Sequence, residues 1–115
     1  MRAVIFEFWP AEGRRDDYFD HVALLREELA KMPGFLSVER FESLTEPGKL
    51  LSLQFWESDE AIANWRRHMG HRKAQAAGRG GIFRDYRLRI AEVDRDYGMT
   101  RRDEAPKDSL AVFDR

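Results

Sequence analysis

The sequence contains no cysteine, and its 115 residues include only eight glycines and four prolines. The lack of cysteine excludes a disulfide framework, a thiolate metal site and a cysteine nucleophile. No apolar run approaches the roughly 18 residues that span a membrane, and residue 1 leads directly into a strand-like pattern without a signal peptide. We therefore expect a cytoplasmic protein with no membrane partner.

An excess of either charge is also missing. Twenty basic and 21 acidic side chains are interspersed and give a formal net charge of -1. A nucleic-acid partner is therefore not expected, since such proteins carry a basic patch or stripe. A hydrophobic content of 43% over this length is enough for one domain with a core.

Hydrophobic periodicity predicts four strands and two helices. Strands rich in β-branched and aromatic residues are predicted at residues 2–9, 35–43, 50–57 and 82–93. The first helix is predicted over residues 14–32, because apolar side chains recur there at helical spacing: Tyr18, Val22, Leu25 and Leu29. Pro33 and Gly34 end that helix, because proline cannot donate a hydrogen bond and glycine allows a sharp turn.

The second helix is predicted to begin at Ser58, whose side chain can cap the free amides of the first turn. A buried stripe follows at spacings of three, four and seven residues, and a glycine-rich break ends it: Ile62, Trp65, Met69 and Ala76, then Gly78, Gly80 and Gly81. At about 100° per residue, His68 and His71 flank this stripe instead of occupying its centre.

The order βαββαβ predicts an α+β, ferredoxin-like fold: a four-stranded antiparallel sheet with two helices on one face. The turn at residues 45–48 should join the second and third strands as a hairpin. This domain is expected over residues 1–94. Residues 95–115 form a charged tail, in which Leu110, Val112 and Phe113 suggest docking on a partner subunit.

The two faces of the predicted sheet differ in character. The helices are expected to cover Phe6, Phe8, Leu51, Leu53, Phe55, Leu88 and Ile90. The opposite face would then carry Ile5, Glu7, Trp9, Ser52, Gln54, Trp56, Arg87 and Arg89. Glu7 either orients a polar ligand there or pairs with an arginine of a neighbouring strand. Because this face is too apolar to leave in water, we expect a homodimer closed on it.

Two stretches, GFLSVERFESLTEPGKLLSLQFWESDEAIANW and HRKAQAAGRGGIFRDYRLRIAEVDRDYGM, resemble the antibiotic biosynthesis monooxygenase (ABM) domain family. The resemblance covers about residues 3–100 and implies a dimeric α+β barrel. Members of this family include cofactor-independent monooxygenases that act on phenols or quinols, and haem-degrading enzymes. The resemblance therefore implies a monooxygenase acting on a small aromatic, quinol or polyketide-like substrate, with no cofactor.

The haem-degrading branch matches less well. Those enzymes resemble this chain at Trp65, but their haem-ligating histidine comes ten residues later, where this chain has Gln75. They also have an asparagine in the first strand, where this chain has Phe6. Haem is therefore disfavoured. His68 and His71 also lack a carboxylate at helical spacing, so no metal site is predicted.

His71, and after it His68, is the candidate catalytic base. A neutral imidazole can accept a phenolic proton and leave an electron-rich anion that reacts with oxygen. The alternative for His71 is a helix-surface histidine bonded to a carboxylate, and His21 is expected to be structural or solvated. The predicted substrate-binding residues are Trp65 and Phe6 as dry walls, Gln75 and Arg87 as holders of oxygen atoms, and Tyr86.

A non-catalytic dimeric module that binds a metabolite or a partner is the rival interpretation. It predicts a filled interior. The enzyme needs a hollow of about 300 Å³ or more, lined by several polar groups.

Overall fold

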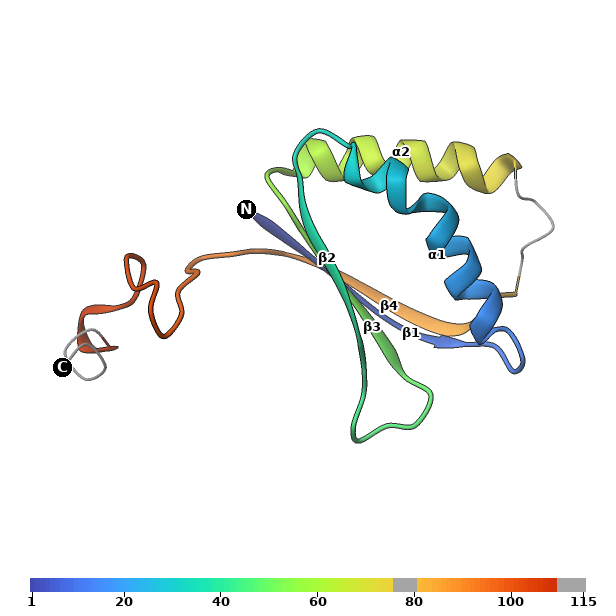
Figure 1. Ribbon diagram of the computed structural model, residues 1–115, viewed down its shortest axis with the longest axis horizontal. Helices are drawn as coiled ribbons and strands as arrows, with labels where there is room; N and C mark the ends of the chain where they lie inside the picture. The colour runs from blue at the N-terminus through green and yellow to red at the C-terminus, as the bar shows by residue number, and fades with distance from the viewer. Residues whose placement is uncertain (76–80, 110–115) are drawn as a thin grey trace.

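The computed structural model describes residues 1–75 and 81–109, except for the side chains of residues 70–75. Its elements follow the predicted order: β1 (Arg2–Pro10), α1 (Arg15–Ala30), β2 (Phe35–Glu42), β3 (Leu50–Trp56), α2 (Asp59–Gln75) and β4 (Phe83–Glu92). The strands form one antiparallel sheet in the order β2-β3-β1-β4. Both helices lie on the same side of this sheet (Figure 1). The predicted ferredoxin-like fold is confirmed.

The predicted start of α2 is also confirmed. Ser58 Oγ accepts a hydrogen bond from the amide of Ala61 at 3.2 Å, and Asp59 and Glu60 place negative charge on the first turn. The hydrogen bond satisfies an exposed amide of the first turn. The two carboxylates are favourable there because the N-terminal end of the helix dipole is positive. In the part of the chain that is described, neither helix is long and apolar enough to cross a bilayer.

The prediction for the faces of β3 is wrong by one residue. In the register of the sheet, Phe6 lies opposite Ser52 and Phe8 opposite Leu50. Paired residues share a face, so the helix side of β3 carries Leu50, Ser52, Gln54 and Trp56. Leu51, Leu53 and Phe55, which were expected under the helices, lie on the other face instead. The expected phases of β1 and β4 are confirmed.

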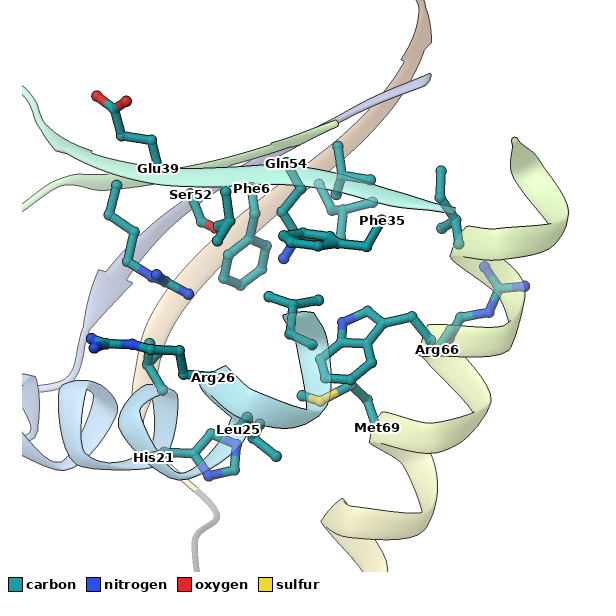
Figure 2. A pocket seen from close by; sticks show the side chains of 18 of the residues that line it. Phe6, His21, Leu25, Arg26, Phe35, Glu39, Ser52, Gln54, Arg66 and Met69 are labelled. Carbon is teal, nitrogen blue, oxygen red and sulfur yellow. The ribbon is translucent and has the colours of Figure 1, made fainter. Parts of the chain in front are cut away.

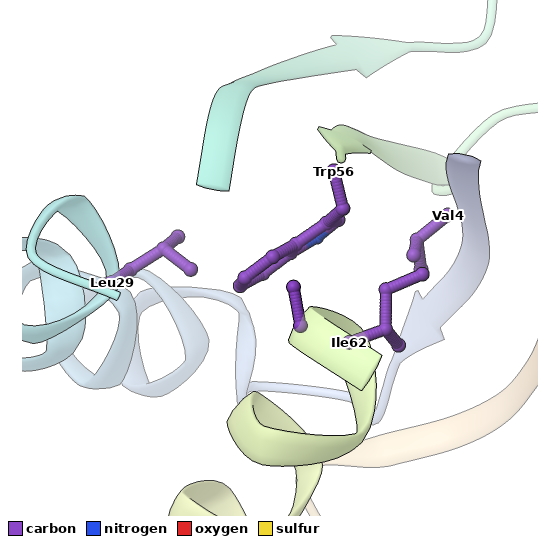
Figure 3. Packing of buried hydrophobic residues seen from close by; sticks show 5 residues of the cluster. Val4, Leu29, Trp56 and Ile62 are labelled. Atoms are coloured by element: carbon purple, nitrogen blue, oxygen red, sulfur yellow. The ribbon is translucent and has the colours of Figure 1, made fainter. Parts of the chain in front are cut away.

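Trp56 accounts for this difference. Its side chain is fully buried, and it belongs to a cluster with Val4, Leu29, Ala61 and Ile62. Figure 3 shows the indole inserted between Leu29 of α1 and Ile62 of α2, beside Val4 of β1. Trp56 and Leu50 are 0% and 5% exposed on the helix side, whereas the two leucines and the phenylalanine of the other face are only partly buried.

A second cluster forms at the other end of the sheet. It contains Phe8, Tyr18, Leu50 and Ile82, with the rings of Phe8 and Tyr18 4.5 Å apart between their centroids. Tyr18 comes from the first turns of α1, whereas Leu29 of the first cluster comes from its end. The hydrophobic core is therefore divided into two parts along the length of α1.

Beyond β4, residues 94–109 run away from the sheet and both helices (Figure 1). Within this segment, the guanidinium of Arg102 lies over the ring of Tyr97 at 5.4 Å and donates to the carbonyl of Gly98. Docking of the tail on a partner subunit stays a prediction, because Leu110, Val112 and Phe113 lie outside the described residues.

Replacing Gly34 by alanine should destabilise the fold more than the same change at Gly48. Both glycines have positive φ, 82° and 81°, so each alanine costs roughly 1–2 kcal/mol in backbone strain. A Cβ at Gly34 would also lie 2.7 Å from the buried Cβ of Ala61, whereas one at Gly48 meets nothing within 4 Å. We expect Gly34→Ala to lose a further roughly 1–3 kcal/mol. Equal losses in urea unfolding would contradict this close approach.

Candidate functional site

A cavity of about 660 Å³ lies between the two helices and the sheet, where the core is divided. It is lined by residues of α1, α2 and all four strands, among them Phe6, Tyr18, Val22, Ser52, Trp65 and Leu88. Figure 2 shows Phe6, Ser52 and Gln54 on the sheet side, Leu25 on α1 and Met69 on α2. This volume falls within the range of small-molecule sites in proteins.

Most of the lining is apolar, and one side is open. Leu88 and Ile90 of β4 line the cavity, yet they are 50% and 45% exposed. β4 is an edge strand, and nearly all of its residues are exposed. The cavity therefore opens to solvent along β4.

Tyr18 and Arg40 form the best-defined polar contact of the cavity. Arg40 Nε donates to Tyr18 Oη at 3.4 Å, joining β2 to α1. Burial raises the pKa of the Tyr18 phenol above its ordinary value, although the hydrogen bond and the charge of Arg40 act in the opposite direction. The phenol therefore stays protonated at neutral pH.

Ser52 and Gln54 put polar groups on the sheet side of the cavity. Ser52 is 5% exposed, and the Gln54 side-chain oxygen accepts a hydrogen bond from Trp56 Nε1 at 2.9 Å. Because that oxygen is engaged, the Gln54 amide nitrogen is left as a donor. Figure 2 shows the Gln54 side chain turned toward the cavity.

The charged residues of the lining are mainly cationic. They are the three arginines Arg26, Arg40 and Arg66 and one acid, Glu39, and the lining also includes the imidazole of His21. Glu39 lies opposite Leu53 in the sheet register, and Figure 2 shows its carboxylate pointing away from the cavity. Among the described residues, no carboxylate lies within ion-pair distance of the three arginines.

The structure brings some of the predicted substrate-binding residues together and separates others. Phe6 and Trp65 line the cavity. The ring of Tyr86 lies 5.6 Å from that of Phe6, but Tyr86 is 59% exposed and sits outside the lining. Arg87 lies opposite Glu7 on the other face of the sheet, so it is outside this cavity.

His68, the second candidate base, does not line the cavity, and the side chain of His71 is not described. His68 lies outside the lining: its Nε2 is 3.0 Å from Glu28 Oε2, and its ring stacks on Trp65. It therefore links α2 to α1, the role considered for His71. α2 includes His71 and Gln75, but their side chains lie outside the described residues. Within the described ranges, no group of three or more histidines and carboxylates could hold a metal ion.

His21 is one of the lining residues that the sequence analysis did not single out as a site candidate. It was expected to be structural or solvated, yet it lines the cavity from α1 together with Arg26. Figure 2 shows the His21 imidazole next to Leu25. The signal was present in the sequence, because residues 21 and 26 directly flank the apolar stripe of that helix.

The opposite face of the sheet has a polar centre. Glu7 pairs with Lys49 and with Arg89, both at 2.8 Å, so the predicted pairing with an arginine of a neighbouring strand is confirmed. The hydrogen bond from Lys49 is the main cause of a lowered pKa at Glu7, and the charges of Lys49 and Arg89 add to it. Trp9 also donates to Glu46, and Lys49 lies over the Trp9 ring at 5.2 Å. The face carries charge, but every carboxylate in this cluster is paired.

Fold and cavity together define a small ferredoxin-like domain with a ligand-sized hollow between its helices and its sheet. A sequence model of the antibiotic biosynthesis monooxygenase family matches residues 1–77. The chain belongs to this family.

Two curated relatives are similar to the chain. The jasmonate monooxygenase ABM of Pyricularia oryzae is 42% identical over 93 residues, covering 81% of this chain and 43% of the relative. The uncharacterised protein YqjZ of Bacillus subtilis is 38% identical over 66 residues, covering 57% of this chain and 56% of YqjZ. The chain thus spans about half the length of the curated relatives it matches.

Solved structures show the same fold at low sequence identity. A candidate antibiotic biosynthesis monooxygenase from Deinococcus radiodurans superposes with a TM-score of 0.70 at 15% identity, covering 85% of this chain and 97% of that one. The haem-degrader MhuD from Mycobacterium tuberculosis, solved with two haems in its active site, superposes with a TM-score of 0.62 at 22% identity, covering 85% and 100%. At these identities the likeness concerns the fold.

Ionisation of Tyr18 should make the protein less stable at high pH. An unfolded tyrosine ionises near pH 10, but the folded Tyr18 keeps its proton to higher pH. The folded state therefore binds more protons in that interval, and stability falls as pH rises through it. Tyr18→Phe removes this dependence. Between about pH 8 and about pH 11, the free energy of unfolding measured in urea should fall more for wild type than for Tyr18→Phe. A constant difference would contradict the raised pKa.

Proposed function

We propose that this chain is a monooxygenase domain that binds a small aromatic, quinol or polyketide-like substrate in the cavity and oxygenates it without a bound cofactor. The observation that supports this is the cavity of about 660 Å³, in a chain of the antibiotic biosynthesis monooxygenase family. The rival, a non-catalytic module with a filled interior, is less consistent with a hollow lined by arginines, a phenol and an amide.

In the proposed reaction a histidine accepts a proton from the substrate. His71 is the candidate from sequence, and His21 is the candidate whose side chain lines the cavity. The resulting anion gives one electron to oxygen, and the substrate radical and superoxide combine into a peroxide anion. The histidine returns its proton to this peroxide. Loss of water leaves a carbonyl on the product, so one oxygen atom enters the product and the other leaves as water.

The remaining residues have supporting roles in this proposal. Phe6 and Trp65 give the substrate apolar walls, which reduce its contact with water and so remove a source of competing protonation. The Gln54 amide nitrogen donates to a substrate oxygen, and Gln75 is kept from the sequence as a second holder of oxygen. Arg87 has no part, because it lies on the other face of the sheet.

Haem degradation is a weaker candidate. Phe6 lines the cavity where the resemblance expects an asparagine, and its ring packs on Phe8 and Phe83 at 5.0 and 5.5 Å. The helix position that holds a ligating histidine in haem-degrading relatives is Gln75 here. This set of residues does not fit the haem site of those enzymes, so no step of the proposed reaction uses haem.

We also propose that the functional unit is a homodimer. Its two subunits pack through the face of the sheet that the helices leave uncovered, which we call the open face. With the corrected phase of β3, this face carries Ile5, Leu51, Leu53 and Phe55 on its central strands, and Phe41 on β2 is 42% exposed. It is therefore more apolar than the sequence analysis expected. The paired charges around Glu7 would lie within the interface, as a partly polar interior requires.

Oxygen uptake tests the proposed reaction. Wild type should consume oxygen with at least one member of a panel of quinols and anthrones. Loss of the proton acceptor should slow uptake by about 10²–10⁴-fold, so either His21→Ala or His71→Ala should show this loss. His68→Ala is the matched control, because His68 bonds to Glu28 outside the lining. Wild type inactive on the whole panel would favour the binding module. A Soret band on adding haemin would favour haem degradation.

Analytical ultracentrifugation tests the dimer. Wild type should sediment as a dimer at about 10 μM, a concentration at which interfaces of ordinary affinity are saturated. Leu53→Glu puts a charge on the open face and should give a monomer. Leu24→Glu makes the same change on a 65% exposed leucine of α1 and should stay dimeric. A monomeric wild type would refute this assembly.

A further inference from the structure

We infer that the cavity takes an apolar molecule carrying one carboxylate, and that Arg40, with Arg26, forms the subsite for this carboxylate. That this molecule is a substrate rests on the proposed function. The subsite itself can be measured by binding alone, without turnover.

Arg40 is positioned to present the end of its guanidinium. It lies opposite Ser52 in the sheet register, so its side chain projects toward the helices, and it is only partly exposed. Its Nε donates to Tyr18, which leaves the two terminal nitrogens as a fork. Such a fork binds the two oxygens of a carboxylate through parallel hydrogen bonds.

Tyr18 strengthens this geometry. The phenol is buried and protonated, and its oxygen already accepts from Arg40. Its own proton is therefore left to be donated, and a bound anion next to Arg40 is an acceptor of the right sign. Tyr18 is fixed by packing on Phe8, so the donor does not have to be ordered when a ligand arrives.

A second cation lies at the same end of the cavity. Figure 2 shows the guanidinium of Arg26 on the side of Glu39, the neighbour of Arg40 on β2, and away from Met69 and Arg66. The only acid of the described lining turns its carboxylate outward. Two guanidinium groups without a carboxylate repel each other in a partly dry site, and a bound anion removes that repulsion.

The rest of the cavity selects the body of the ligand. Away from this end its lining is largely apolar and includes Leu29, Phe35, Ile62 and Met69. A molecule with a hydrocarbon or aromatic body and one charged end matches both parts. A carboxylate pairs with the Arg40 fork through its two oxygens. A phosphate monoester, with nearly two charges and three acceptor oxygens, is the rival anion that the experiment below separates from it.

Isothermal titration calorimetry with three probes tests this subsite: 2-naphthoate, its methyl ester and 2-naphthyl phosphate. The ester keeps the aromatic body and removes the charge. Wild type should bind the acid at least about ten-fold more tightly than the ester, the difference expected of a charge-assisted pair. Arg40→Met should abolish this preference while leaving the affinity for the ester within about two-fold.

Arg66→Met is the matched control. It removes a cation from the same lining, at the end where Met69 lies, and should keep the preference for the acid. Circular dichroism and thermal unfolding of each variant show whether it is folded. If Arg40→Met does not fold, Arg40→Lys replaces it; that variant keeps the charge without the fork and should retain only part of the preference.

Several results would overturn the inference. They are equal affinity of wild type for acid and ester, no binding of 2-naphthoate up to about 1 mM, tighter binding of the phosphate, and loss of the preference in Arg66→Met instead of Arg40→Met. A preference for the acid together with no oxygen uptake on any substrate would refute the proposed reaction and leave the subsite standing. Oxygen uptake without a preference for the acid would refute the subsite and leave the proposed reaction standing.

Discussion

The packing of Trp56 is the constraint on which the rest of the structure depends. One fully buried indole holds the ends of both helices against the sheet. Its position sets the phase of β3, because neighbouring residues of a strand must face opposite sides. The same phase puts Ser52 and Gln54 under the helices and the leucines of β3 on the open face. A single aromatic contact therefore determines both the polar groups of the cavity and the apolar character of the opposite surface.

The division of the core explains how so small a domain encloses a ligand-sized space. Two hydrophobic clusters pack the two ends of α1 on the sheet, and the cavity lies between them. The gap is lined by side chains that do not fill it, so the clusters must supply the packing that the middle lacks. Arg40 and Tyr18 bridge β2 and α1 across this gap with a hydrogen bond in place of apolar contact.

The sequence was sufficient for the fold but not for the site. Caps, turns and periodicity predicted the order of all six elements, because each signal is local. The phase of β3 was ambiguous, because apolar residues occur in both phases of LLSLQFWE. Ser52 and Gln54 were interpreted as marking the outer face, although polar residues under a helix also mark a cavity. His21 and Arg26 lie on α1 and Arg40 on β2, so only the tertiary structure could show that the three meet at one space.

The half-exposed side chains of Leu88 and Ile90 have a kinetic consequence. Because the hollow opens past the outermost strand, a molecule can come and go without either helix moving. Since no described residue covers this opening, residence time would be set by the contacts inside. Occupancy would then follow the surrounding concentration of the molecule closely.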